Sequence, residues 1–147
     1  MFGVTNSVRP AEPGDVDDIA RLLHDFNTEF DEPTPPPDVL AARLRRLLAE
    51  DTVVLLVGDG PDGLALMRFR PSLWTEGLEC YLGELYVVPE LRGQGRGRAL
   101  MEAAIAYTRE RGADYMELNV DEGDDAAHAL YRSVGFRATA AYYEREL

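Results

Sequence analysis

The chain has 147 residues, 46% of them apolar, which is enough to bury most of its unfolded surface in one core, so we expect a single domain over residues 1–147. Its formal net charge of -12 argues against a nucleic-acid partner, because such proteins need a basic face to displace counterions from phosphates. No apolar run approaches the ~18 residues of a membrane span and no signal-peptide pattern opens the sequence, so we expect a cytoplasmic protein with no membrane partner.

The N-terminal third is predicted to contain a short strand and two amphipathic helices. Residues 7–10 favour the strand, and the apolar side chains of residues 16–30 recur at helical spacing after Asp15, which can cap the first turn. Four prolines within residues 31–37 interrupt this pattern and predict a stiff surface loop. Leucines at helical spacing over residues 40–48 then indicate a second helix.

The middle of the chain is predicted to form a β-hairpin followed by another strand. Two apolar runs, residues 52–57 and 64–69, flank a turn rich in glycine and aspartate. After a loop or strand bulge over residues 71–77, residues 80–88 indicate the next strand. This strand contains the only cysteine, Cys80, which has no partner in the chain, so we expect a buried, inert thiol, no disulfide and no metal site.

The last third is predicted to alternate helix, strand, helix and a final extended segment. A helix packs through Leu100 and its helical neighbours and stops at Gly112, and residues 115–120 form a strand. Asp124 or Asp125 can cap a short helix that ends at Gly135, and residues 136–147 are extended. The order is therefore β-α-α-β-β-β-α-β-α-β, which predicts an α/β domain of the α+β type.

A glycine-rich loop joins the strand 80–88 to the next helix and has the layout of an anion site. Its glycines allow tight turns and close approach of a ligand, and the first N–H groups of the helix point outward. A dinucleotide-binding fingerprint would directly follow the first strand of a βαβ unit, whereas three strands and two helices come before the strand that leads into this loop. A Walker loop needs lysine, but all 15 basic residues are arginine, a composition that also suggests a GC-rich bacterial genome.

The loop resembles the pyrophosphate-binding signature of the GNAT superfamily of acetyl-CoA-dependent N-acetyltransferases, which is Arg/Gln-x-x-Gly-x-Gly/Ala. The matching residues are Arg92-Gly93-Gln94-Gly95-Arg96-Gly97, and Glu84-Leu85-Tyr86-Val87-Val88-Pro89 before them looks like the family's fourth strand. Downstream, Ala129-Leu130-Tyr131-Arg132-Ser133-Val134-Gly135-Phe136 is similar to its Leu-Tyr-x-x-x-Gly-Phe segment. The resemblance implies a GNAT fold, with a mixed, mostly antiparallel sheet of about six to seven strands and about four helices, the sheet splaying between the fourth and fifth strands.

The same resemblance implies where acetyl-CoA binds. Backbone N–H groups of the loop would hold the pyrophosphate, two arginines would add positive charge, and the pantetheine arm would pair with the fourth strand. At one position the family commonly has asparagine and this chain has Asp124, which puts one polar contact in doubt. The predicted cofactor-binding residues are Val87, Val88, Arg92, Gly93, Gln94, Gly95, Arg96, Gly97, Asn119, Asp124 and Tyr131.

The resemblance implies direct attack of a neutral amine on the thioester, and two residues are candidates for the catalytic groups that this reaction needs. Tyr131 matches the tyrosine that protonates or hydrogen-bonds the leaving thiolate, the alternative being a core tyrosine. Glu84 is a carboxylate in an otherwise apolar strand, which is costly to bury without a partner or a role. It is our candidate base, the alternative being a solvated or structurally paired acid.

The acceptor is left open. Glu29, Asp31 and Glu32 lie in a region that often borders the acceptor site in this family, although a solvated loop is the simpler explanation of these acids. Trp74 is a further candidate, with core or dimer packing as the alternative. We expect the acceptor to be a primary amine of a small molecule, which receives an acetyl group from acetyl-CoA or a longer acyl group from another acyl-CoA. A non-catalytic CoA-binding sensor is the alternative from another class. A homodimer through the tyrosine-rich C-terminal segment is also a hypothesis.

Overall fold

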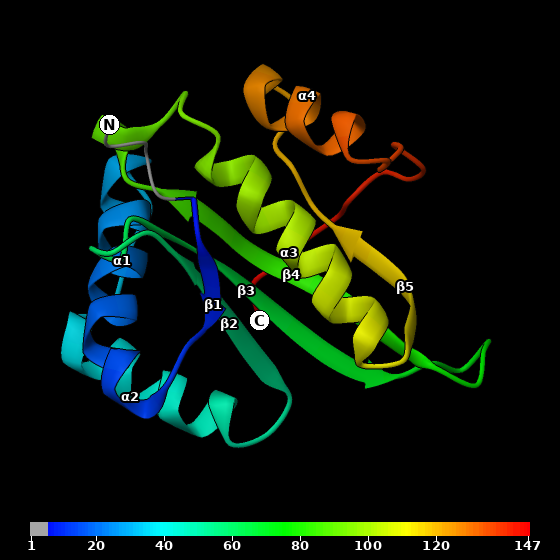
Figure 1. The fold of residues 1–147 in the computed structure, drawn as a ribbon, viewed down its shortest axis with the longest axis horizontal. Coiled ribbons are helices and arrows are strands. Elements are labelled where there is room, and N and C mark those ends of the chain that lie inside the picture. The colour runs from blue at the N-terminus through cyan, green and yellow to red at the C-terminus, as the bar shows by residue number, and fades with distance from the viewer. Residues whose placement is uncertain (1–5) are drawn as a thin grey trace.

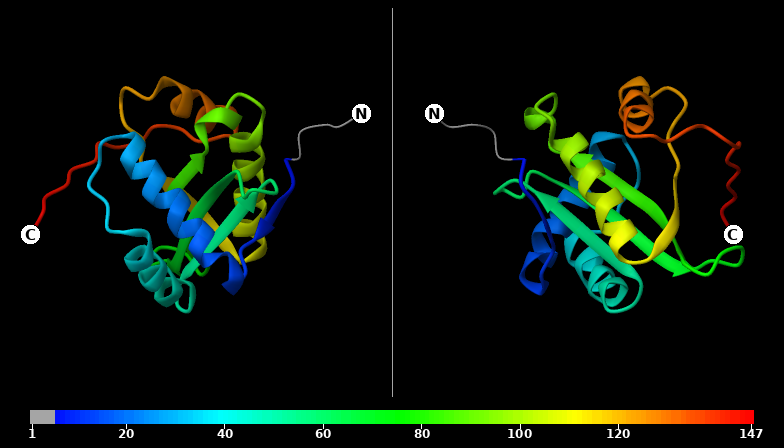
Figure 2. Two further views of the ribbon diagram at one scale, coloured as in Figure 1. Left: turned by 90° about the vertical axis from the view of Figure 1, so that its left-hand side faces the viewer. Right: turned by 45° about the vertical axis from the view of Figure 1, so that its right-hand side comes forward.

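The computed structural model describes residues 6–147, which form one five-stranded sheet with helices on both of its faces (Figures 1 and 2). The elements in chain order are β1 (Val8–Pro10), α1 (Val16–Glu29), α2 (Pro37–Leu48), β2 (Thr52–Val57), β3 (Gly63–Pro71), β4 (Leu78–Val87), α3 (Arg96–Glu110), β5 (Ala113–Leu118) and α4 (Asp125–Ser133). Short 3₁₀ turns, Pro13–Asp15 and Pro89–Leu91, precede α1 and follow β4. All of the predicted helices are present within one or a few residues of their expected ends.

The sheet has the strand order β1-β2-β3-β4-β5, and only its last pair is parallel. The predicted hairpin is present, since β2 and β3 pair antiparallel from Val57 and Gly63 to Thr52 and Arg68. Antiparallel pairing then continues from β3 to β4. The fold is therefore the mixed, mostly antiparallel α/β arrangement that the sequence predicts.

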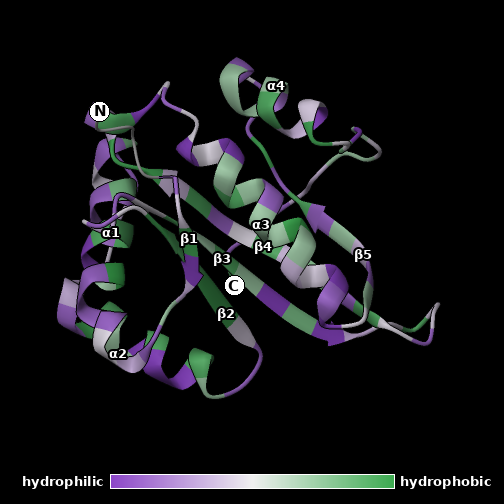
Figure 3. Cartoon of the chain, viewed as in Figure 1, coloured by the Kyte–Doolittle hydropathy of each residue, from purple (hydrophilic) through white to green (hydrophobic). Residues whose placement is uncertain are grey.

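Helices cover the two faces of the sheet with separate apolar cores. On one face, Leu100 and Met101 of α3 pack against Met67 of β3. On the other, Ile19 of α1 and Leu44 of α2 pack against buried side chains of β2 and β3. Each of α1, α2 and α3 carries both apolar and polar residues, which Figure 3 shows as mixed green and purple. No helix within residues 6–147 combines the length and apolarity needed to cross a membrane.

Strands β4 and β5 separate before β4 ends. Their parallel pairing runs from Leu78 beside Ala113 to Leu82 beside Leu118 and stops there, while β4 continues to Val87. The pairing of β3 with β4 also shifts here, because Leu66 pairs with Glu84 and Met67 with Leu82, which leaves Gly83 as an extra residue. Such a bulge increases local twist and redirects the strand. It lies where the two strands part.

The C-terminal segment corrects the predicted strand count. Residues 136–147 form no strand, so the described part of the chain has five strands in its sheet rather than six to seven. Phe136 packs against the core, but the side chains after it are exposed, including Tyr142 at 65% and Tyr143 at 91%. Because the side chains after Phe136 stay exposed, no burial of apolar area offsets the entropy cost of ordering an edge strand here. A homodimer through this segment stays a prediction.

Candidate active site

A cleft with a volume of about 790 Å³ opens where β4 and β5 part. This is within the usual range for small-molecule and cofactor sites. Helix α4 lies beyond the end of β5 and borders the opening (Figure 1). The lining residues are Phe26, Glu29, Phe30, Leu85, Tyr86, Val87, Leu91, Arg92, Arg96, Gly97, Asp121, Gly123, Asp124, Ala126, Ala127 and Leu130.

The glycine loop forms one end of the cleft and leads directly into α3. Gly93 and Gly95 have φ angles of 76° and 87°, which is the left-handed region where a side chain is strained. Gly95 is the N-cap of α3 and no side chain caps this end of the helix. The first N–H groups of an α-helix have no intrahelical partner, so those of Arg96 and the residues after it are available to an anion.

Both arginines of the loop are held by carboxylates. The Arg92 guanidinium makes two contacts with Glu29, at 2.7 and 2.8 Å, and Nε donates to the Val87 carbonyl at 2.9 Å. Arg96 is only 7% exposed, and its Nε donates to Asp62 Oδ2 at 3.0 Å. Their charges are thus locally balanced, which leaves the unpaired N–H groups as the donors that the loop offers. Direct contact of either guanidinium with a pyrophosphate stays a prediction.

Glu84 directly follows the bulge in β4, close to the point where β5 stops pairing with β4. Alternation along the strand puts it on the same face as Tyr86, which packs against α1. Burial raises the pKa of the Glu84 carboxyl above its usual range, with no compensating partner among the described residues. Its charge in turn contributes to raising the pKa values of Tyr81 and Tyr131, so all three side chains share one electrostatic environment.

Tyr131 lies on α4 and packs against the α3 core and the ring of Phe136, at 6.2 Å between centroids. Burial, followed by the charges of Asp124 and Glu84, raises the pKa of Tyr131 to about 12. The helix begins as predicted, because Asp124 accepts a hydrogen bond from the Ala127 N–H at 3.0 Å. Tyr131 itself does not line the cleft, although Ala127 and Leu130 of the same helix do.

Other predicted cofactor residues divide between the cleft and its surroundings. Val87 lines the cleft, whereas Val88 lines a smaller hollow of about 330 Å³ that Tyr86 also borders. Asn119, just after β5, donates to the Tyr81 hydroxyl at 2.9 Å and so links the two strands where they part. A contact of Asn119 with the cofactor stays a prediction.

The four predicted acceptor residues do not gather at one place. Glu29 lines the cleft, while Asp31 and Glu32 are exposed just beyond the end of α1. Trp74 is 87% exposed in the β3–β4 loop, at the opposite end of the ten-residue strand β4 from the glycine loop. That separation is about 30 Å at the usual rise per strand residue. An acceptor contact at Trp74 stays a prediction.

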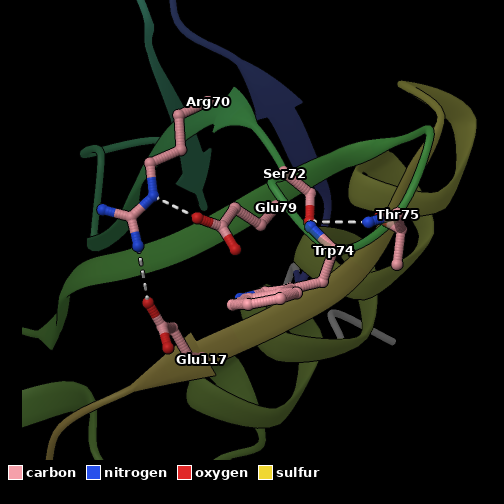
Figure 4. A network of polar contacts seen from close by, with 6 residues as sticks. All are labelled: Arg70, Ser72, Trp74, Thr75, Glu79 and Glu117. Atoms are coloured by element: carbon pink, nitrogen blue, oxygen red, sulfur yellow. Dashed lines mark hydrogen bonds and ion pairs between the residues drawn. The ribbon is translucent and has the colours of Figure 1, made fainter.

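The surroundings of Trp74 are an ordinary polar surface network (Figure 4). Arg70 pairs with Glu79, and with Glu117 at 3.3 Å, which connects β3, β4 and β5. The Ser72 hydroxyl accepts hydrogen bonds from the Trp74 and Thr75 backbone N–H groups, at 3.2 and 3.3 Å. These contacts account for the loop without any ligand.

Sequence reasoning missed the aromatic wall of the cleft. The Phe26 ring stacks on Tyr86, with 4.8 Å between centroids, and meets Phe30 edge-on at 5.4 Å. The two phenylalanines are four residues apart at the end of α1, a spacing that predicts one face of a helix but does not show what that face meets. Tyr86 and Leu85 were recognisable only as strand residues.

Comparison with known proteins gives the family. The model of the acetyltransferase (GNAT) family matches residues 16–136. The crystal structure of a protein from Arthrobacter sp. FB24, provisionally named an acetyltransferase, has a TM-score of 0.88 and 46% identity, over 96% of both chains. The aminoglycoside N(6')-acetyltransferase type 1 of Stenotrophomonas maltophilia is 29% identical, over 95% of this chain and 91% of that protein.

A second group of relatives matches only in part. The mycothiol acetyltransferase of Thermobispora bispora is 52% identical over 65 residues, which are 42% of this chain and 22% of that protein. The chain thus spans about a fifth of the length of this relative. The family match instead covers most of the chain and agrees with the splayed strands and the glycine loop. The chain therefore belongs to the GNAT family of acetyltransferases.

Proposed function

We propose that the protein transfers the acetyl group of acetyl-CoA to a primary amine of a small-molecule acceptor by direct attack. The observation that carries this proposal is the cleft between β4 and β5, which ends at the uncapped N-terminus of α3. Relatives named after an aminoglycoside and after mycothiol support an acyl transfer to a small molecule. The acceptor of this chain is not identified by them.

The residues present fit acetyl-CoA. Beyond Leu82, β4 has no neighbour on its β5 side, so its backbone groups there are available to the amides of a pantetheine arm, in the manner of an added strand. The N–H groups after Gly95 would hold the pyrophosphate, aided by the helix dipole. Two of the three acidic side chains that line the cleft are already engaged, since Glu29 pairs with Arg92 and Asp124 caps α4.

The chain's own residues would handle the protons of the transfer. When bound, acetyl-CoA supplies the thioester carbonyl, at which the C–N bond forms and the C–S bond breaks. Glu84 takes a proton from the attacking amine, directly or through water, and its raised pKa brings it nearer to neutrality, where a base is effective. Tyr131 stays protonated at neutral pH and donates a hydrogen bond to the departing sulfur.

Acetyl-CoA at about 100 times its Kd is expected to raise the melting temperature by about 5–10 °C. Binding to the folded state alone contributes about 2.7 kcal/mol at that excess, and each kcal/mol shifts the Tm of a chain of this size by about 2–4 °C. Differential scanning fluorimetry measures the shift. Pantetheine, which lacks the pyrophosphate, serves as the matched ligand and should give a much smaller one.

Turnover then separates the enzyme from a sensor. Release of free thiol from acetyl-CoA across a panel of primary amines is expected for the enzyme, and the same panel with longer acyl-CoA donors tests the donor. A thermal shift without turnover on any amine would favour a CoA-binding sensor. No shift at saturating acetyl-CoA would contradict the proposed function altogether.

Glu84→Gln is expected to lower kcat about 10- to 100-fold and to remove one limb of the pH profile. A base works only when ionised, so the wild-type rate should fall as pH drops through the raised pKa of Glu84. Glutamine has no such titration, and the remaining dependence should reflect the acceptor amine alone. Steady-state kinetics from pH 5 to 9 measure both effects.

Glu79→Gln is the matched control for this variant. It removes a carboxylate from the same strand, but one that is paired with Arg70 on the surface, so kcat should stay within about twofold of wild type. If Glu84→Gln kept both the rate and the acidic limb, Glu84 would be a structural acid and the base would lie elsewhere.

A further inference from the structure

The ion pair between Glu29 and Arg92 joins two parts of the molecule that are 63 residues apart in sequence. Glu29 is the last residue of α1, and Arg92 opens the glycine loop. The contact is a two-point one, from Nη1 to Oε2 at 2.7 Å and from Nη2 to Oε1 at 2.8 Å. This fork geometry is the strongest form of an arginine–carboxylate pair and fixes orientation as well as distance.

The position of Glu29 is not explained by the helix that carries it. A carboxylate at a helix C-terminus faces the negative end of the helix dipole, which disfavours it by about 0.3–1 kcal/mol. Here the pKa of Glu29 is nevertheless lowered, with the hydrogen bond from Arg92 as the first cause. The favourable partner therefore comes from the loop and not from α1.

Aromatic side chains shield the pair from one side. The Tyr86 hydroxyl donates to Glu29 Oε1 at 3.3 Å, and the Arg92 guanidinium lies 5.6 Å from the centre of the Tyr86 ring. The Phe26 ring stacks on the Tyr86 ring. The Glu29 side chain is 27% exposed and that of Arg92 is 42% exposed, so the pair is only partly screened by water.

Arg92 in turn is tied to the backbone of the loop. Its Nε donates to the Val87 carbonyl at 2.9 Å, which closes the turn between β4 and the glycines. Gly93 and Gly95 follow immediately and give this segment high conformational freedom in the absence of restraints. A loop already held in its binding form loses less entropy when a ligand arrives.

We propose that Glu29 is a positioning residue for the pyrophosphate loop, holding Arg92 and thereby the turn before Gly93 in its ligand-binding form. This inference rests on the proposed function, because it assigns Glu29 to the cofactor side of the site. It differs from the sequence-based prediction that Glu29 attracts the acceptor amine. The two roles make opposite kinetic predictions.

Glu29→Gln is expected to raise the Kd of CoA about 5- to 10-fold and the KM of acetyl-CoA in parallel, with kcat and the amine KM near their wild-type values. The loss should be confined to the pyrophosphate end, so affinity for pantetheine should not change. Amide hydrogen exchange of the ligand-free protein should also quicken across residues 92–97. Calorimetry, steady-state kinetics and exchange mass spectrometry measure these effects.

Asp18→Asn is the matched control, because it removes an ion pair with Arg21 from the exposed face of the same helix. It should change neither CoA affinity nor loop exchange. In a double-mutant cycle, Glu29→Gln combined with Arg92→Gln should weaken CoA binding no more than Arg92→Gln alone, since both substitutions break one unit.

Several outcomes would overturn the inference. A raised amine KM with an unchanged CoA Kd would assign Glu29 to the acceptor, and strictly additive effects in the cycle would show that the two residues act apart. If the wild-type protein binds CoA and Glu29→Gln binds it with the same Kd, this inference alone would be overturned. A wild-type protein that binds no CoA would overturn the proposed function and this inference with it.

Discussion

Replacing Tyr131 with phenylalanine is expected to lower kcat about 100-fold while leaving the Kd of acetyl-CoA within about twofold of wild type. The substitution keeps the ring that packs against Phe136 and the α3 core, so the fold should be preserved. Only the hydroxyl is lost, and with it the hydrogen bond proposed for the departing sulfur. Single-turnover kinetics with a good amine acceptor measure this step directly.

The raised pKa of Tyr131 decides whether its hydroxyl transfers a proton to the thiolate or only donates a hydrogen bond to it. At about 12 it is several units above the ~8.5 of an ordinary thiol, so complete proton transfer to the thiolate is uphill and a hydrogen bond is the favoured contribution. The protonated form is present below this pKa and is lost only as pH rises through about 12. The kcat profile should consequently show no alkaline limb from Tyr131 up to about pH 10.

Tyr107→Phe is the matched control, because it deletes a hydroxyl on α3 that accepts a hydrogen bond from Arg111 at 3.2 Å. Its kcat should equal that of wild type. An unchanged chemical step in Tyr131→Phe would make Tyr131 a core tyrosine and would leave the sulfur without a donor from α4.

The elements could be predicted from the sequence because each has a local cause. The β-branched run of β2 gives Thr52–Val57 at the predicted ends, and the apolar spacing of α1 identifies the side that faces the sheet. The glycines at 93 and 95 likewise require positive φ angles for reasons visible in one short segment. Local patterns of this kind carry most of the fold.

The details of the site depend on contacts that no local pattern contains. The extra residue Gly83 changes the alternation of β4 and hence which side chains share a face, but a bulge has no unique sequence signal. Arg92 was recognisable as part of a motif, whereas its partner Glu29 is distant in sequence. Arg96 was predicted to add positive charge at the loop, whereas its burial against Asp62 arises from the position of the β2–β3 turn.

That burial leads to the prediction with the largest effect on stability. Asp62→Ala is expected to lower the free energy of unfolding by about 2–4 kcal/mol, because it leaves the Arg96 guanidinium with its charge unpaired in the interior. One contact survives, from Nη1 to Gln94 Oε1 at 3.1 Å, and it carries no opposite charge. The melting temperature should fall by roughly 4–16 °C, as calorimetry or circular dichroism would show.

Glu102→Ala provides the control, since it breaks an exposed pair with Arg98 on the same helix and should cost about 0.5 kcal/mol or less. Equal losses in the two variants would show that the Arg96–Asp62 pair is solvated and contributes little. The pair has a further consequence for the site, because Arg96 begins α3 and Asp62 also accepts, through its backbone carbonyl, the Val88 N–H at 2.9 Å. The β2–β3 turn therefore holds both the end of β4 and the start of α3. Asp62→Ala should weaken CoA binding as well as folding, whereas Glu102→Ala should leave CoA binding unchanged.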